Sequence, residues 1–382
     1  MTLIKQIPDK IWGDVWRTHR TTGRLVRGQE WSQLFYMVFP DYVPVDSVVA
    51  GLRARPEIKF AGAPIIAVRD AEPNDPEYAN GGQWALTRVI ANKAWDVTTG
   101  SSDIVVAIVE AAGNGESGIP KTDHPDFQTA LGESKFAPGG QTGPVDAHAT
   151  EVAGMVGAAT DNNIGMASLG WNIRMKPFAF QFSNDPLVSS PNLAATLDNV
   201  LGDTDVKVIN MSFGLLTTES FNCGSCLGIV RLAGVDDIGA VVGLLDEALD
   251  SGIIVVGSAG NNLEELVTLS PACMACLDEI AQERYPAAYK STNPDGRQVI
   301  AVAAIQNAPD PRVPNNNFGD FIDVAAPGIL VKTTITTGQI GEVNGTSFSA
   351  PMVSALAGLV KSIDPAIGPV KFENILAATS TE

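Results

Sequence analysis

Asn344-Gly345-Thr346-Ser347-Phe348-Ser349-Ala350-Pro351 places the hydroxyl of Ser347 directly after a Gly-Thr pair, where a helix is predicted to begin. Gly345 permits a tight backbone approach, and the apolar, small-residue segment 352–360 continues as a helix that can pack in a crowded interior. The free N–H groups and the dipole of such a helix start favour a developing negative charge. Ser347 is therefore a candidate nucleophile, and the alternative is that Ser347 and Ser349 are ordinary helix caps.

The composition is that of a globular protein with a large excess of acidic residues. Of the 382 residues, 45% are hydrophobic and 18% charged, and 25 Lys and Arg against 43 Asp and Glu give a net charge of −18. This charge disfavours nucleic acid and anionic membranes as partners. Apolar runs stay below the ~18 residues that a membrane-spanning helix needs. Because residues 1–10 lack the apolar core of a secretory signal, we expect a cytoplasmic protein if residue 1 is the true start, and a secreted one if a signal peptide was removed.

The chain divides into four predicted regions. Residues 1–30 are polar and irregular and remain unassigned. Residues 31–70 contain strand and helix patterns that predict a small α/β unit. The segment 71–83 is rich in Pro, Asn and Gly, which predicts an exposed linker, and residues 84–382 are predicted to form one large domain.

Within residues 84–382, apolar segments of strand length alternate with helical segments. Their near-continuous Val and Ile content is typical of parallel strands that are buried on both faces. We therefore predict a doubly wound α/β fold, with a mostly parallel sheet and helices on both faces. The predicted strands are 104–109, 206–211, 253–256 and 299–303, and the predicted helices are 149–159, 240–251 and 349–362.

The glycine-rich stretch Gly113-Asn114-Gly115-Glu116-Ser117-Gly118 follows a predicted strand and matches the G-x-G-x-x-G of dinucleotide-binding sites. A dinucleotide site requires a helix to begin at once, with its N-terminus at the pyrophosphate. Pro120 and Pro125 follow instead, and they prevent a long helix. A nucleotide-dependent oxidoreductase is therefore disfavoured.

Three further residues are candidates for catalysis. Glu110 ends a predicted strand at the edge where a parallel sheet exposes its functional groups, although a solvated strand end is the alternative. His148 begins an apolar helix and is the strongest candidate base, because His19 and His124 lie in polar, loop-like sequence; a structural helix cap is its alternative. Asn261 follows a strand and carries an amide that could donate to an oxyanion.

Taken together, the candidates lie in a pattern that resembles the subtilisin-like serine proteases, or subtilases, from about residue 83 to the C-terminal region. The motifs occur in the family's order: 105–110, 148–154, 210–214, 258–261 and 345–351.

The resemblance implies a serine endopeptidase that hydrolyses peptide bonds through an acyl-enzyme on Ser347. It also implies that His148 is the general base, that Glu110 orients the imidazole, and that Asn261 and the Ser347 N–H hold the oxyanion. By the same analogy, the segment Ser212-Phe213-Gly214 would pair with the backbone of a peptide or protein substrate. No cofactor is required for this chemistry.

The chain departs from the family pattern at three positions. Glu110 stands where the family usually has Asp, Ala149 where it has Gly, and Glu151 where it has a second His. The extra methylene of Glu carries its carboxylate about 1.5 Å further, so the side chain must fold back or start from a shifted backbone. We expect a functional but slower protease, and a catalytically weak or inactive subtilase-like binding protein is the alternative.

Residues 31–70 resemble the second half of a subtilase propeptide. The resemblance implies a zymogen in which this segment assists folding and inhibits the large domain as an intramolecular partner. Residues 1–30 match less clearly.

Two further features predict structural metal sites. The pairs Cys223/Cys226 and Cys273/Cys276 have the form of a four-thiolate zinc site, with disulfides or free thiols as alternatives. The loop 160–165 resembles the calcium loop of many subtilases, with Asp161 and Asn163 as candidate ligands, and a solvated Asx turn is the alternative.

Overall fold

The computed structural model describes most of the chain and divides it into two compact units, Met1–Val68 and Arg69–Glu382. The described residues are 2–5, 16–18, 25–27, 35–40, 43–62, 71–113, 117–182, 186–215, 218–223, 226–231, 239–261, 285–291, 296–313, 316–317 and 319–381.

The first unit is a small α/β unit. Its strand β1 (Thr2–Lys5) pairs antiparallel with β4 (Phe35–Val38), and β2 (Trp16–Thr18) pairs antiparallel with β3 (Leu25–Arg27). The helix α1 (Val45–Arg53) follows. Because β1 and β4 share a sheet, the unassigned residues 1–30 and the predicted α/β unit 31–70 contribute to the same unit.

Within α1, all of whose residues are described, none is buried. Val45 at its start and Phe60 beyond its end are both exposed. Asp46 in the first turn and Arg53 in the last turn complement the helix dipole. A role for residues 31–70 as a propeptide stays a prediction.

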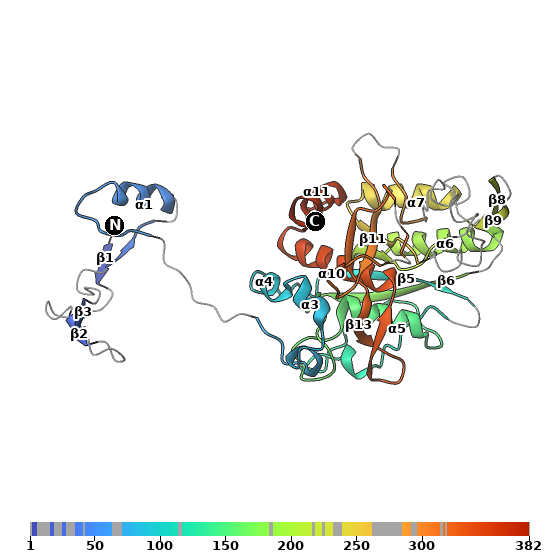
Figure 1. Ribbon diagram of the computed structural model, residues 1–382, viewed down its shortest axis with the longest axis horizontal. Helices are drawn as coiled ribbons and strands as arrows, with labels where there is room; N and C mark the ends of the chain where they lie inside the picture. The colour runs from blue at the N-terminus through green and yellow to red at the C-terminus, as the bar shows by residue number, and fades with distance from the viewer. Residues whose placement is uncertain are drawn as a thin grey trace. The chain divides into compact units, whose positions relative to one another are not determined.

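The second unit is built on a six-stranded sheet whose strand pairs are all parallel, so the predicted α/β fold is confirmed (Figure 1). An antiparallel hairpin of β13 (Ile329–Thr334) and β14 (Ile340–Asn344) lies outside this sheet. In spatial order the sheet strands are β12 (Val324–Pro327), β11 (Ile300–Ile305), β10 (Ile254–Ser258), β7 (Val206–Met211), β5 (Val105–Ala112) and β6 (Arg174–Gln181).

Helices cover both faces of the sheet, and two apolar layers result (Figure 1). In β5, Val106 and Ile108 belong to one layer, whereas Val105, Ala107 and Val109 belong to the other, as the period of two in a strand requires. The first layer includes α5 (Ala147–Gly157), α10 (Thr346–Ile363) and α11 (Pro369–Thr379), and the second includes α6 (Pro186–Leu201) and α7 (Gly239–Asp250).

The strand β6 was not predicted from the sequence. Its residues Lys176 and Pro177 interrupt the apolar run that marks the other strands. Proline is tolerated here because β6 is an edge strand, where one side of the backbone needs no ladder partner. Lys176 is buried but forms ion pairs with Asp203 and Asp205.

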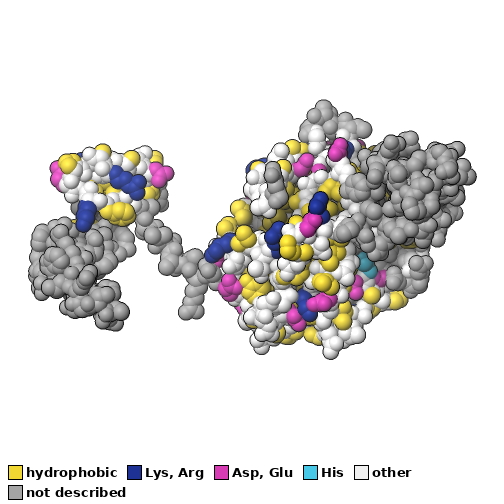
Figure 2. Space-filling view, in the orientation of Figure 1, with side chains coloured by type: hydrophobic (Ala, Val, Ile, Leu, Met, Phe, Trp, Pro, Cys, Tyr) yellow, Lys and Arg dark blue, Asp and Glu magenta, His cyan; other side chains and the backbone are white. Residues whose placement is uncertain are grey.

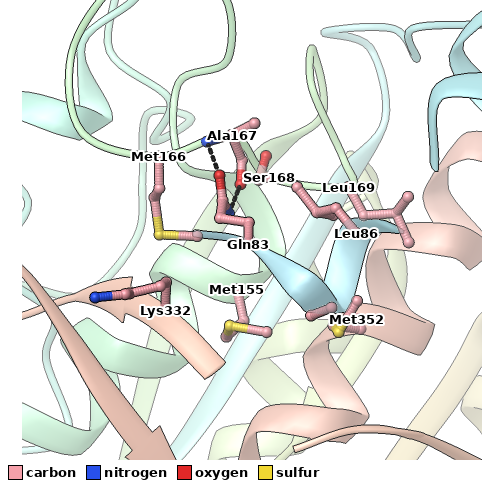
Figure 3. Close-up of a pocket in the computed structure, with 10 residues that line it drawn as sticks. Gln83, Leu86, Met155, Met166, Ala167, Ser168, Leu169, Lys332 and Met352 are labelled. Carbon is pink, nitrogen blue, oxygen red and sulfur yellow. Dashed lines mark hydrogen bonds between the residues drawn. The ribbon is translucent and has the colours of Figure 1, made fainter. Parts of the chain in front are cut away.

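The segment 71–83, predicted to be an exposed linker, belongs to the second unit, and Glu77 N donates a hydrogen bond to Gly165 O at 2.9 Å. Three short helices begin here: α2 (Pro76–Ala79), α3 (Trp84–Arg88) and α4 (Ala91–Trp95). Buried Gln83 closes the segment, and its side chain forms hydrogen bonds with both the N–H and the C=O of Ala167, at 2.9 and 2.7 Å (Figure 3).

Figure 3 also shows residues of α5 and α10 that line a narrow cavity near this contact. Met155 of α5 and Met352 of α10 line a narrow cavity together with Leu86 of α3 and Lys332 of β13. The short helix α3 therefore lines this cavity together with α5, α10 and β13.

The visible face of the second unit carries Lys and Arg side chains scattered among acidic and apolar ones, over the atoms coloured in Figure 2. Among the described residues, the helices are too short or too polar to cross a bilayer.

Candidate functional site

Glu110 lies near the C-terminal end of β5, on the sheet face that α5 and α10 cover. Side chains alternate along a strand, so Glu110 shares the face of Val106 and Ile108. Glu110 is buried, and its Oε2 atom accepts a hydrogen bond from His148 Nδ1 at 2.8 Å. The longer side chain of Glu thus reaches the candidate base at an ordinary hydrogen-bond distance.

His148 is presented by the first turn of α5. Asp146 is the N-cap of this helix, because its Oδ1 atom accepts a hydrogen bond from Ala149 N at 2.8 Å. Its Oδ2 atom accepts from Gly118 N at 3.2 Å, which ties the helix start to the segment that follows β5. The ring of Phe348 lies beside the imidazole, with 5.7 Å between the ring centroids.

The carboxylate of Glu110 controls the pKa of His148. Burial by itself lowers the pKa of the imidazole from its usual 6.5, but the charge and the hydrogen bond of Glu110 outweigh it. With smaller contributions from Glu151 and Asp146, the pKa of His148 rises to about 9. The raised pKa favours the protonated imidazole, which must lose its proton before it can act as a general base.

Ser347 stands in the first turn of α10. Gly345, the N-cap residue, has a φ of 141°, where only glycine is free of strain, and its N–H donates to Gly328 O at 2.8 Å. The side chain of Ser347 is half-buried, and its Oγ–H donates to Ser212 O at 3.2 Å. First-turn N–H groups have no acceptor within the helix, so they are available to an anion.

One hydrogen bond fixes the side-chain amide of Asn261, and a second holds the residue before it against the same threonine. Its Oδ1 atom accepts a hydrogen bond from Thr346 N at 3.0 Å, and Thr346 Oγ1 accepts from Gly260 N at 3.0 Å. The Nδ2 group remains to donate, and it lies 3.0 Å from the place that a Cβ atom would occupy on Gly345. The absence of a side chain at Gly345 therefore leaves the room in which the amide sits.

A pocket of about 230 Å³ opens beside these groups. The described residues that line it carry no charge, which suits a neutral part of a peptide chain better than a charged side chain. The predicted substrate-binding segment, residues 212–214, lines this pocket together with Ser347 and Asn261. The lining residues are Ala111, Phe182, Ser212, Phe213, Gly214, Ser258, Gly260, Asn261, Thr346 and Ser347.

The glycine-rich stretch after β5 does not begin a long helix: the next helical element is the short 3-10 helix Pro125–Phe127. Residues 114–116 of the stretch lie outside the described residues. Gly118, at a φ of 68°, packs on the backbone of Glu110, where an added Cβ atom would lie 3.2 Å from the carbonyl oxygen. In the described part of this stretch, the lack of a side chain at Gly118 thus allows close packing against Glu110.

The loop 160–165 places the predicted calcium ligands Asp161 and Asn163 at the surface, both with positive φ. The Oδ1 atom of Asp161 accepts a hydrogen bond from Asn74 N at 3.2 Å, and Asn163 N donates to Asn74 Oδ1 at 2.6 Å. Among the described residues there is no cluster of three or more His, Cys, Asp or Glu that could hold a metal.

Two fully buried carboxylates, Asp75 and Asp126, lie on the inner side of this loop. Asp75 accepts hydrogen bonds from Asp161 N and Asn162 N at 2.7 and 3.3 Å, and Asp126 accepts from Met166 N at 2.8 Å. Burial, with a smaller contribution from the charge of Asp75, raises the pKa of Asp126 to about 7.

The cysteine prediction is only partly covered by the structure. Cys223 and Cys226 face each other as Cα partners across the hairpin of β8 (Thr218–Cys223) and β9 (Cys226–Arg231). Cys273 and Cys276 lie outside the described residues. A zinc site or disulfides at these cysteines therefore stays a prediction.

Several residues of the site were missed by sequence reasoning. The composition of 71–83 predicts that Asp75 is exposed, and Asp126 follows His124 in a stretch whose polar sequence predicts a loop. The structure instead buries His124, whose Nε2 atom lies 3.1 Å from Gln339 O. His19 lies outside the described residues. The signal that could have found Asp126 is Phe127 directly after it, a side chain of the core.

Comparison with known proteins shows which family the second unit matches. Residues 101–382 match the subtilase family over most of the chain. Halolysin of Haloferax mediterranei is 28% identical over 357 residues, which cover 90% of this chain and 58% of halolysin. The thermophilic serine proteinase of Bacillus sp. strain AK1 is 27% identical over 322 residues, which cover 83% of this chain and 67% of that protein.

Two solved structures have the same fold. MycP1 with its N-terminal propeptide removed has a TM-score of 0.55 and 23% identity, covering 78% of this chain and 91% of that chain. The prenylagaramide maturation protease PagA has a TM-score of 0.52 and 20% identity, covering 76% of this chain and 88% of that chain. The family match, the serine proteinase relatives and the shared fold agree, and we conclude that this chain belongs to the subtilase family.

Proposed function

We propose that this protein is a serine endopeptidase that cleaves peptide or protein substrates through an acyl-enzyme on Ser347. The observation that carries the proposal is the 2.8 Å hydrogen bond from His148 Nδ1 to Glu110 Oε2, on the same sheet face as the Ser347 helix. His148 accepts the proton of Ser347 Oγ as the serine attacks the scissile carbonyl, and later donates it to the leaving amine.

The carbonyl carbon becomes tetrahedral during this attack, and its oxygen gains negative charge. Asn261 Nδ2 and the Ser347 N–H are the donors that stabilise this charge in the proposal. Two observations support them: Thr346 N anchors the other side of the Asn261 amide, and Gly345 leaves the space in which that amide sits. Water then attacks the acyl-enzyme with His148 again acting as base, which releases the second product.

The first prediction tests the nucleophile. The protein is expected to react with a fluorophosphonate active-site label at Ser347 and to cleave a peptide library. Ser347→Ala is expected to lose labelling and at least ~10⁴-fold in kcat/KM, since oxyanion stabilisation and binding alone sustain little turnover. Mass spectrometry of the labelled peptide and the cleavage profile are the measurements.

Ser362→Ala is the matched control for this experiment. Ser362 is a serine of the same helix whose Oγ bonds to Gly358 O within α10, and its loss is expected to leave labelling and cleavage unchanged. A folded parent protein that neither labels at Ser347 nor cleaves any peptide would instead favour a subtilase-like binding protein without catalytic activity.

We also propose that calcium binds at the loop 160–165 and that Asp75 and Asp126 hold it, with Asp161 and Asn163 at the rim. The two fully buried carboxylates support this proposal. Bound calcium would supply no chemistry to the reaction; it would lock the loop to the segment that begins the second unit.

The second prediction concerns the removal of this cation. Chelation with EGTA is expected to lower the Tm by at least several degrees, because a ligand that binds only the native state stabilises it by mass action. Asp126→Asn is expected to lower the Tm and to abolish the response to added calcium, whereas exposed Asp123→Asn should keep that response. An identical Tm of the parent with EGTA and with millimolar calcium would refute the calcium proposal.

A further inference from the structure

The helix that carries the nucleophile lacks one of its own hydrogen bonds. In an α-helix the N–H of each residue donates to the carbonyl four positions earlier. Four positions after Ser347 comes Pro351, which lies inside α10 and has no N–H. The carbonyl oxygen of Ser347 therefore lacks the donor that a regular α-helix would supply.

A side chain from another element supplies the missing donor. The Oγ–H of Ser212, just beyond β7, donates to Ser347 O at 2.8 Å. The contact is reciprocal, because Ser347 Oγ donates to Ser212 O at 3.2 Å. Two hydrogen bonds thus join the nucleophile to the first residue of the predicted substrate-binding segment.

The direction of the Ser212 hydroxyl is set by two further buried groups. Asn210 Nδ2 donates to Ser212 Oγ at 3.0 Å. Since a hydroxyl has only one hydrogen, this bond leaves the hydrogen of Ser212 free to point at Ser347 O. Asn210 is itself oriented by Ser354, whose Oγ–H lies 3.0 Å from Asn210 Oδ1 and 3.1 Å from Ala350 O.

All three members are buried, with exposed fractions of 3% for Ser212 and 0% for Asn210 and Ser354. Buried polar groups that satisfy one another hold a single arrangement, because breaking one bond leaves another group unsatisfied. The chain of bonds begins one helical turn beyond Pro351, crosses to β7 and returns to the nucleophile.

We propose that Ser354, Asn210 and Ser212 are positioning residues that fix the backbone of Ser347, and that Pro351 is the reason that they are needed. The proposal rests on the proposed peptidase function. By holding Ser347 O, the three residues fix the peptide plane after the nucleophile and so the direction of its Oγ. They also keep the nucleophile in register with the segment that binds the substrate.

The third prediction tests this network with kinetics. Ser212→Ala is expected to lower kcat and the rate of fluorophosphonate labelling about tenfold, with KM within about twofold, since the lost hydrogen bond acts on the geometry of attack. Ser354→Ala is expected to cause a smaller loss of about threefold, because Asn210 keeps its bond to Ser212. Ser362→Ala is again the control.

A double-mutant cycle with Pro351→Ala gives the sharper test. Alanine at this position supplies the missing N–H, which can donate to Ser347 O in place of the Ser212 hydroxyl. In the Pro351→Ala background, Ser212→Ala is therefore expected to lower kcat by at most about threefold, compared with about tenfold in the parent.

The outcomes separate the network from the function itself. A parent that is inactive and unlabelled defeats the proposed function, whereas an active parent whose kcat is unchanged by Ser212→Ala and Ser354→Ala defeats only the network. A loss of kcat that follows a fall in Tm, or that is equally large with and without Pro351, would overturn the positioning role in favour of a merely structural one.

Discussion

Replacing Glu110 with Gln is expected to lower kcat about 10⁴-fold while KM changes little. Glutamine has nearly the shape of glutamate, but it removes the negative charge that stabilises the imidazolium, and its amide no longer selects the required tautomer of His148. The change to the amide of a triad acid has an effect of this size in other serine proteases. Steady-state kinetics on a peptide that the parent cleaves is the measurement.

The same substitution is expected to shift the pH profile. In the parent, kcat/KM should rise with pH up to about 9, because only neutral His148 can accept a proton and Glu110 raises the pKa of His148 to about 9. Without the carboxylate, burial dominates and the apparent pKa should fall well below that of the parent. Exposed Glu133→Gln is the control, with the parent's profile expected.

The pair also links folding stability to pH. Because the pKa of His148 is raised on folding, the stabilisation is fully present below the unfolded value of 6.5 and is lost as the pH rises through about 9. The difference in Tm between the parent and Glu110→Gln should therefore shrink over this interval. Activity thus rises where the stabilisation by this pair fades.

Two results would contradict the role assigned to Glu110. One is a Glu110→Gln variant with the kcat and pH profile of the parent. The other is a Glu110→Asp variant that is as active as the parent, which would show that the 2.8 Å contact of the longer side chain is not needed.

Replacing Gly345 with Ala is expected to lower kcat about 100-fold and to reduce the Tm. Two effects combine: the φ of 141° is strained for any residue with a Cβ atom, and that atom would lie 3.0 Å from Asn261 Nδ2. Displacing one oxyanion donor costs about 10²–10³-fold in kcat. Kinetics and thermal unfolding of the purified variant are the measurements.

Gly243→Ala is the matched control, since a Cβ atom on Gly243, within α7, meets open space and φ is not positive. This variant is expected to keep its activity and to gain slightly in stability, because alanine favours the helix. A Gly345→Ala variant with full kcat would show that the Asn261 amide does not need the space, and a loss confined to Tm would leave strain as the only effect.

Much of the site could be predicted from local sequence, because its parts lie at the ends of regular elements. The apolar run of β5 predicts a buried strand, and the position of Glu110 near the end of this strand makes it a candidate. The capping residue Asp146 and the apolar helix after it locate His148. In the same way, Gly345 at the start of the helix α10 predicts that Ser347 lies in the first turn of that helix. Each of these signals spans only a few residues.

Other features depend on contacts between distant segments, which no local pattern encodes. Asp75 was predicted to lie in an exposed linker, but it is buried because the loop 160–165 donates two backbone N–H groups to it. Likewise, nothing in the local sequence around Ser354 predicts its hydrogen bond to Asn210, which lies 144 positions away in the chain.

Strand period and helix capping are local properties, so the parallel α/β fold and the candidate residues Glu110, His148 and Ser347 can be predicted from the chain alone. The contact between the longer carboxylate of Glu110 and His148, and the replacement by Ser212 of the N–H that Pro351 lacks, become visible only in the folded protein. The physical reason is that a hydrogen bond between distant segments depends on distances of tenths of an ångström, which the packing of the two helix layers on the sheet sets.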